Sequence, residues 1–127
     1  MNIEHVALWV MDLERARKWW ETYFDATAGS EYVNAAGFHS YFLKFPDGGA
    51  RLELMYDGTQ RPNNDDRPHE GYGHVAVSVG SKGAVDDLTA RLVLDGFRCL
   101  SGPRTTGDGY YESCVLDTEG NRVEITV

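Results

Sequence analysis

Two histidines and two glutamates recur at matching places in the chain, and together these residue types could bind a metal ion. His5 lies in "IEHVALWV" and His74 in "YGHVAVSV", an offset of 69 residues (74 − 5). Glu53 lies in "RLELMY" and Glu124 in "NRVEITV", an offset of 71 residues (124 − 53). Near-equal offsets indicate an internal duplication of about half the chain. Imidazole and carboxylate groups are suitable ligands for a divalent cation.

The four segments that carry these residues have the alternation of β-strands. Side chains of a strand point to opposite faces in turn, so each His and Glu falls on the face opposite to the apolar residues. Two carboxylates ~4 Å apart repel by about 4 kcal/mol at an effective dielectric of 20, and a divalent cation between them would offset this. In the alternative interpretation, the glutamates pair with Arg51 and Arg122 and the histidines are only hydrogen-bonded.

The rest of each half predicts one helix and further strands. For the first half we expect a strand over 3–10, a helix over 13–25, an ill-defined strand near 30–34, and extended segments over 38–45 and 50–56. For the second half we expect a strand over 73–79, a helix over 82–95, and strands over 97–100, 110–116 and 121–127. The fold class is therefore α+β, with two tandem βαβββ modules that form a curved, barrel-like cleft.

The domain organisation follows from the repeat. We predict a single domain over 1–127, made of a module 1–56, a polar linker 57–72 and a module 73–127. Asp12 and Ser81 are the expected helix N-caps, and Gly96 follows the second helix. The apolar stripe of the first helix is Leu13, Ala16, Trp20 and Phe24.

The composition is that of a globular, acidic protein. Of 127 residues 42% are hydrophobic, and 20 acids against 12 bases give a net charge of −8, which argues against nucleic-acid or anionic-membrane partners. We find no signal-peptide pattern, and no apolar run approaches the ~18 residues of a membrane span. Cys99 and Cys114 are too few for a disulfide framework, so we expect a cytoplasmic location and small, mostly buried thiols.

At this point the segments "EHVALWV", "RLELMY", "GHVAVSV" and "DTEGNRVEITV" resemble those of the vicinal oxygen chelate superfamily. This superfamily includes glyoxalase I, extradiol dioxygenases, fosfomycin-resistance thiol transferases and methylmalonyl-CoA epimerase. The resemblance covers essentially the whole chain and implies paired βαβββ modules. By position, the metal ligands of the superfamily match His5, Glu53, His74 and Glu124. A glutamate at the fourth-strand place, Glu53, resembles bacterial glyoxalase I, whereas dioxygenases and fosfomycin enzymes leave that place unligated and the epimerase has Gln.

The resemblance implies a glyoxalase I-like lyase or isomerase, similar to lactoylglutathione lyase. It would convert the hemithioacetal of a 2-oxoaldehyde, such as methylglyoxal, to a 2-hydroxyacyl thioester with one divalent ion per site. Nickel, cobalt or zinc is expected, with iron or manganese less favoured. Glu124 would act as the base that moves the proton, with Glu53 as its partner. Bacterial glyoxalase I builds each site from two subunits, so the resemblance implies a homodimer with sites at the interface.

The substrate pocket departs from that pattern. Glutathione-using bacterial enzymes tend to carry an Arg four residues after the first-strand His and an Asn shortly after the fourth-strand Glu. Here these places hold Trp9 and Asp57. A Trp cannot reproduce the fork-like contacts of Arg with carboxylates, so a different thiol or a non-thiol substrate is open.

Four residues are candidates for contact with the substrate. Trp9, Met55 and Thr126 share the polar strand face, where they could line a pocket or pack between the modules. Arg104 lies in the Gly-rich segment "SGPRTTGDGYY", residues 101–111, which could be a lid that brings Arg104 to a substrate anion. A plain loop is the alternative for that segment.

Two other classes of function compete with the lyase. Another enzyme of the superfamily, a thiol transferase, epimerase or iron dioxygenase, is one. Iron chemistry prefers a three-ligand facial triad with open positions, and Glu53 argues against it. A ligand-binding protein of the bleomycin-resistance type, with an aromatic ligand in a Trp-lined cleft, is the other. Such proteins usually lack the four ligands, so their presence argues for an enzyme.

Overall fold

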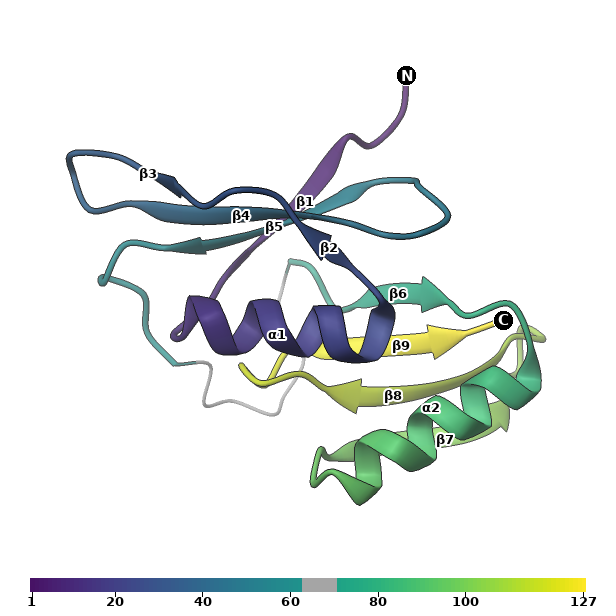
Figure 1. Cartoon of the computed structure of the whole chain (residues 1–127). Helices are drawn as coiled ribbons and strands as arrows, with labels where there is room; N and C mark the ends of the chain where they lie inside the picture. Colours follow the sequence, from purple (N-terminus) through teal and green to yellow (C-terminus); the bar gives the residue numbers. More distant parts are fainter. Residues whose placement is uncertain (63–70) are drawn as a thin grey trace. The chain divides into compact units, whose positions relative to one another are not determined.

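The chain folds as two compact units of the same construction, Met1–Pro62 and Asn63–Val127 (Figure 1). The computed structural model describes residues 1–62 and 71–127. The units correspond to the two predicted modules. Residues 63–70, within the predicted linker 57–72, lie outside the described residues, and the grouping of both modules into one domain stays a prediction.

In the first unit, one helix packs on a sheet with a parallel pair at one edge. The elements are β1 (His5–Trp9), α1 (Leu13–Phe24), β2 (Thr27–Ala28), β3 (Tyr32–Val33), β4 (His39–Lys44) and β5 (Arg51–Tyr56). The sheet order is β1-β5-β4-β2, and β3 also pairs with β4. β1 is parallel to β5, while the pairs that β4 makes are antiparallel. α1 packs against β4 and β5.

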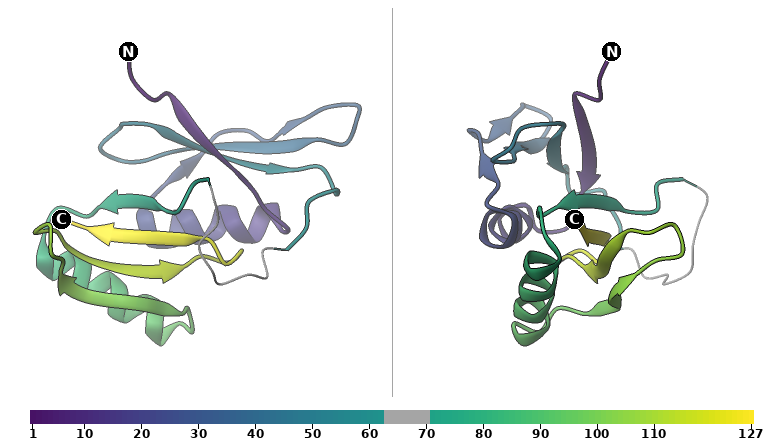
Figure 2. Two further views of the ribbon diagram at one scale, coloured as in Figure 1. Left: turned by 180° about the vertical axis from the view of Figure 1, so that it is seen from behind. Right: turned by 90° about the vertical axis from the view of Figure 1, so that its right-hand side faces the viewer.

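The second unit repeats this topology. Its elements are β6 (Val75–Ser78), α2 (Lys82–Leu94), β7 (Cys99–Thr105), β8 (Tyr111–Leu116) and β9 (Arg122–Thr126). The sheet order is β6-β9-β8-β7, with β6 parallel to β9 and the other pairs antiparallel. α2 lies along one face of this sheet, against β7, β8 and β9 (Figure 2). Neither sheet closes on itself, and the α+β class with two tandem βαβββ modules is confirmed.

Local sequence signals explain where the helices begin and end. The side chain of Asp12 accepts a hydrogen bond from the backbone N–H of Arg15 at 2.9 Å, and that of Ser81 accepts one from Ala84 at 3.1 Å. Both residues are therefore the N-caps that the sequence predicted. Gly96 follows α2 with a φ of +93°, a left-handed conformation that glycine adopts without steric cost. Neither helix among the described residues is long and apolar enough to cross a membrane.

The buried residues lie where the periodicity placed them. The predicted stripe of α1 is buried against its sheet, together with Leu43, Leu52 and Leu54. In the second unit, Val85 and Leu92 of α2 are buried with the apolar residues Val115, Val123 and Ile125 of the sheet. Burial alternates along β5 and β9, so the polar residues of these strands occupy the other face. That face is the one available for chemistry.

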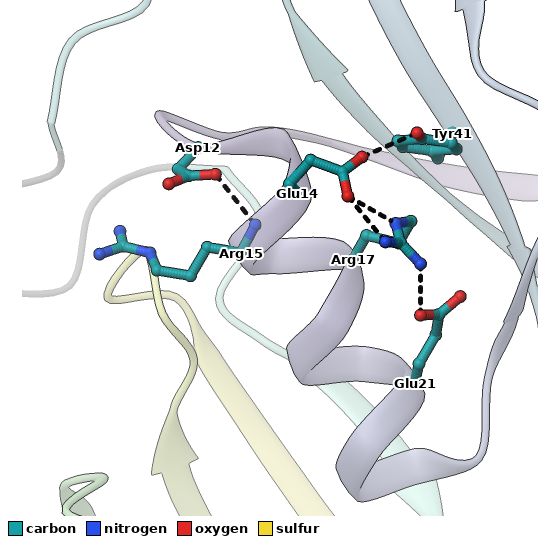
Figure 3. Close-up of polar contacts among 6 residues, drawn as sticks. All are labelled: Asp12, Glu14, Arg15, Arg17, Glu21 and Tyr41. Atoms are coloured by element: carbon teal, nitrogen blue, oxygen red, sulfur yellow. Dashed lines mark hydrogen bonds and ion pairs between the residues drawn. The ribbon is translucent and has the colours of Figure 1, made fainter.

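A polar network also ties α1 to its sheet (Figure 3). The Tyr41 hydroxyl donates to Glu14 at 2.7 Å, and Arg17 donates to Glu14 at 2.7 Å and to Glu21 at 2.5 Å. The Arg17 guanidinium lies 5.5 Å from the centre of the Tyr41 ring. The hydrogen bond to the Glu14 carboxylate raises the pKa of the Tyr41 hydroxyl. The network thus fixes the outer edge of α1 over β4.

The edge strand β7 corrects one prediction. Residues 101–105 belong to this strand, so Arg104 is not on a lid or a plain loop but pairs with Glu112 in the sheet. Register shifts on either side of Ser101 give the strand a bulged geometry. Gly102 and Pro103 are typical of loops, so this part of the strand was not predicted from the sequence. At Gly102 a Cβ atom would lie 2.4 Å from the Glu112 carbonyl oxygen, and φ is +81°. Only glycine fits there.

Candidate metal centre

The first unit brings His5 and Glu53 together across the parallel pair β1 and β5. His5 pairs in register with Arg51, and Ala7 pairs with Glu53. The side chains of His5 and Glu53 therefore lie on the same face of the sheet, two residues apart in register. The His5 Nε2 atom is 3.8 Å from a Glu53 carboxylate oxygen. The Glu53 side chain is only 14% exposed, which limits the rotamers that its carboxylate can adopt.

The other ring nitrogen of His5 has a carboxylate partner that the sequence interpretation missed. His5 Nδ1 is 2.5 Å from Glu4 Oε2. Arg51 donates from Nε to Glu4 Oε1 at 2.7 Å and forms an ion pair with the same oxygen through Nη2. The hydrogen bond from His5, assisted by Arg51, lowers the pKa of Glu4. Arg51 therefore pairs with Glu4, and the alternative in which it pairs with Glu53 is wrong.

Phe42 completes this arrangement on β4. It stands opposite Glu53 in the register of β4 and β5, so its ring lies on the same face. The ring meets His5 edge-on with 5.2 Å between ring centres. The Arg51 guanidinium lies 4.1 Å from the centre of the same ring. Only a known sheet register could have revealed this contact, because Phe42 and His5 are far apart in sequence.

The second unit repeats the His–Glu pair with a closer contact. His74 immediately precedes β6, and Glu124 pairs in register with Ala76 across the parallel pair β6 and β9. His74 Nε2 is 3.0 Å from Glu124 Oε2, and the Glu124 side chain is 21% exposed. Two ligand atoms that each lie about 2.1 Å from a cation, at right angles, are about 3 Å apart. The distance is that of a direct hydrogen bond or ion pair, and it is also the spacing that two ligands of one divalent ion would have.

Cys114 stands opposite Glu124 in the register of β8 and β9. Burial raises the pKa of the Cys114 thiol, and the Glu124 charge raises it further. Its thiol is thus mainly protonated near neutral pH, which does not favour nucleophilic chemistry. Both cysteines are free and only half-buried rather than mostly buried. This difference arises because Cys114 lies on the polar face of the sheet.

The predicted substrate-binding residues fall on the same faces as the His–Glu pairs. Trp9 pairs in register with Met55, is 49% exposed and meets Phe38 edge-on at 6.1 Å. In the second unit, Thr126 pairs with Glu112, which in turn pairs with Arg104. Arg104 therefore lies two strands from Thr126 on one sheet face. Contact of these residues with a substrate stays a prediction.

Each unit therefore offers one imidazole and one carboxylate to a metal. Within either unit, counting only the described residues, no third His, Cys, Asp or Glu joins them in a metal-binding group. That the two pairs meet at one ion, in one chain or across two, stays a prediction.

Comparison with known proteins decides the family. The sequence profile of the Glyoxalase/Bleomycin resistance protein/Dioxygenase superfamily matches residues 2–125. The chain belongs to this superfamily. Its members commonly bind a divalent metal ion, in agreement with the donor set of the two pairs.

The chain is also similar to individual proteins over nearly its full length. The chain is 27% identical over 129 residues to the uncharacterized protein YqjT of Bacillus subtilis, covering 97% of this chain and 96% of YqjT. A glyoxalase/bleomycin resistance protein/dioxygenase domain from Frankia sp. is 22% identical, with a TM-score of 0.82 and coverage of 100% and 97%. The trypanothione-dependent glyoxalase I of Leishmania major is 20% identical, with a TM-score of 0.78 and coverage of 99% and 86%. These two structures share the fold.

Proposed function

We propose that this protein is a metal-dependent, glyoxalase I-like lyase or isomerase. It converts the hemithioacetal of a 2-oxoaldehyde and a thiol to a 2-hydroxyacyl thioester. The observation that carries the proposal is the repeated His–Glu pair. In each unit, one imidazole and one carboxylate face each other across a parallel strand pair, at 3.8 Å in one and 3.0 Å in the other.

The two pairs, His5 with Glu53 and His74 with Glu124, together hold one divalent ion. Nickel, cobalt or zinc suits two imidazoles and two carboxylates. When bound, the ion supplies Lewis-acid stabilisation of the negative charge that develops on the substrate oxygens. Two comparisons support this reaction class. The matching superfamily includes glyoxalases, and the similar Leishmania major protein is a glyoxalase I.

Glu124 is the general base of the reaction. Its carboxylate takes the proton from the carbon next to the carbonyl group and returns it to the neighbouring carbon, a task for a carboxylate in reach of both atoms. Its side chain is more exposed than that of Glu53, 21% against 14%, which favours Glu124 over Glu53 for contact with substrate. Glu53 is its partner in moving the proton.

The substrate lies along the polar faces of both sheets. Trp9 and Met55 contact its apolar part, and Thr126 and Arg104 contact its polar or anionic part. Trp9 presents an aromatic ring where a fork-like cation contact would need Arg, so a thiol other than glutathione suits the site better. We further propose a homodimer with sites at the subunit interface and, since both thiols are free, a reducing cytoplasm.

One observation favours a second candidate, the binding of an aromatic ligand without turnover. The rings of Trp9, Phe38 and Tyr32 form a row, with 6.1 Å and 6.2 Å between successive centres. Trp9 and Tyr32 are 49% and 56% exposed. Exposed aromatic rings of this kind offer stacking surface to a flat ligand.

Elemental analysis of the purified protein, followed by assays on methylglyoxal with several thiols, tests the proposal. We expect stoichiometric nickel, cobalt or zinc and formation of a thioester. A metal-loaded protein that is inert toward every thiol adduct would sink the lyase assignment and favour the binding protein. Absence of stoichiometric metal after incubation with all three ions would remove both the metal site and the lyase.

A further inference from the structure

Glu4 contacts His5 at Nδ1, whereas within residues 1–62 and 71–127 the structure shows no carboxylate in the same position at His74. An ionised carboxylate has only acceptor sites, so the 2.5 Å contact between His5 Nδ1 and Glu4 Oε2 requires the proton on Nδ1. On the other side of the ring, 3.8 Å separates Nε2 from Glu53, which is beyond hydrogen-bond distance. With the proton on Nδ1, Nε2 carries the lone pair of the ring, and it is the ring nitrogen nearer to Glu53.

Glu4 is itself fixed by two further residues. Its side chain is 59% exposed, so burial does not hold it in place. Instead Arg51 donates to its second oxygen at 2.7 Å, and the Arg51 guanidinium rests on the Phe42 ring at 4.1 Å. The same ring meets the edge of His5. The imidazole is thus held at Nδ1 by a carboxylate and packs perpendicular to an aromatic ring.

We propose that Glu4 is a positioning residue for metal binding, which fixes the Nδ1-protonated form of His5 and turns Nε2 toward the ion. The inference rests on the proposed metal site. Partners of this kind raise the basicity of a ligating imidazole, and their loss typically lowers metal affinity about 10–100-fold. In the second unit Gly73 precedes His74 and has no side chain that could do this.

The protonation of the imidazole is tested in metal-free protein by long-range ¹H–¹⁵N NMR spectra at pH 8.5. We expect the wild-type His5 ring to be protonated at Nδ1 only. The Glu4→Ala variant should show a substantial Nε2-protonated population. Glu4→Gln, which keeps an acceptor oxygen but not the charge, should lie between the two. A His5 ring in the same form in all three proteins would overturn the proposal.

The metal affinity is then measured by titration with Ni²⁺, Co²⁺ and Zn²⁺. We expect Glu4→Ala to raise the dissociation constant about 10–100-fold and Glu4→Gln to raise it less. Glu31→Gln is the matched control, because Glu31 contacts His39 Nδ1 at 2.8 Å in the same manner but outside the proposed site. That variant should bind metal as the wild type does.

The outcomes separate the inference from the function on which it rests. If the wild-type protein binds none of the three ions, the proposed function fails, while the NMR spectra still decide whether Glu4 fixes the His5 ring. If the wild type binds metal and Glu4→Ala binds it equally well, the proposed function stands and the role of Glu4 is refuted. An equal loss in Glu31→Gln would also refute it.

Discussion

His5 faces Glu53 across 3.8 Å in the first unit, whereas His74 faces Glu124 across 3.0 Å in the second. Both pairs lie at the parallel first and last strands of a βαβββ module, although His5 begins β1 and His74 immediately precedes β6. What differs is the residue opposite each glutamate. Glu53 has Phe42 there and Glu124 has Cys114. The duplication has preserved the direction of four side chains while their surroundings diverged.

On the proposed function, this difference leads us to expect different roles for the two pairs. The first pair is held from outside by Glu4, Arg51 and Phe42, as suits an anchor for the ion. The second pair has a slightly more exposed glutamate, which stands opposite the small Cys114 side chain. The comparison therefore predicts unequal effects of equivalent substitutions in the two units.

The largest effect should come from the two glutamates. If Glu124 is the base, as proposed, Glu124→Gln should lower kcat about 10³-fold. If Glu53 is a metal ligand and its partner, Glu53→Gln should weaken metal binding and lower kcat about 10²-fold. Steady-state kinetics and metal titration of both variants measure this. Glu119→Gln, an acid in the turn before β9, is the control. Wild-type turnover in Glu53→Gln would remove that residue from the mechanism.

The second-largest effect should come from the edge strand of the second unit. This strand is the continuous, bulged β7, whereas the first unit has the two short strands β2 and β3 in its place. Gly102→Ala should destabilise the protein by about 2 kcal/mol or more, because the left-handed φ alone costs roughly 1–2 kcal/mol and the new Cβ would meet backbone. Gly107→Ala, in open space, is the control. Chemical denaturation compares the two, and equal stability would show that the bulge tolerates a side chain.

Trp9 and Ser78 occupy equivalent places, each four residues after the histidine of its unit. If the first unit binds the apolar part of the substrate, Trp9→Ala should raise KM about 5–10-fold, in line with the loss of part of an aromatic contact. Ser78→Ala should leave KM unchanged, and neither should alter metal content. An unchanged KM in Trp9→Ala would assign that ring to packing alone.

The smallest effect on stability should come from the hydrogen bonds between helix and sheet. In both units a tyrosine of the sheet donates to an acid of the helix. Tyr41 donates to Glu14 on α1, and Tyr111 donates to Asp86 on α2 at 2.6 Å with Lys82 over its ring. Tyr41→Phe should cost about 0.5–1 kcal/mol, because Glu14 also belongs to the network with Arg17. Tyr111→Phe should cost less. Thermal unfolding would contradict the comparison if the order were reversed.

Much of the fold could be predicted because its signals are local. Alternation gave the faces of β5 and β9, and the caps Asp12 and Ser81 gave the helix starts. The short strand β2 and the bulges of β7 were missed, since two-residue pairings and register shifts depend on the neighbouring strand rather than on local sequence.

In the candidate site, too, some features could be predicted from the sequence and others could not. Each His–Glu pair could be predicted, because the offsets of the repeat and the strand period place both side chains on one face. The contact of Glu4 with His5 could not be predicted, because an exposed acid next to a histidine in sequence is common. What distinguishes Glu4 is the hydrogen bond that it accepts from Arg51, which depends on the fold. Phe42 required the register of β4 with β5.

The most direct test of the metal site is anomalous diffraction from crystals of the protein loaded with nickel. We expect one strong peak per site, within bonding distance of His5, Glu53, His74 and Glu124 from one chain or from two. A peak bonded to only one of the His–Glu pairs, or to the Cys114 sulfur in place of a glutamate, would contradict it.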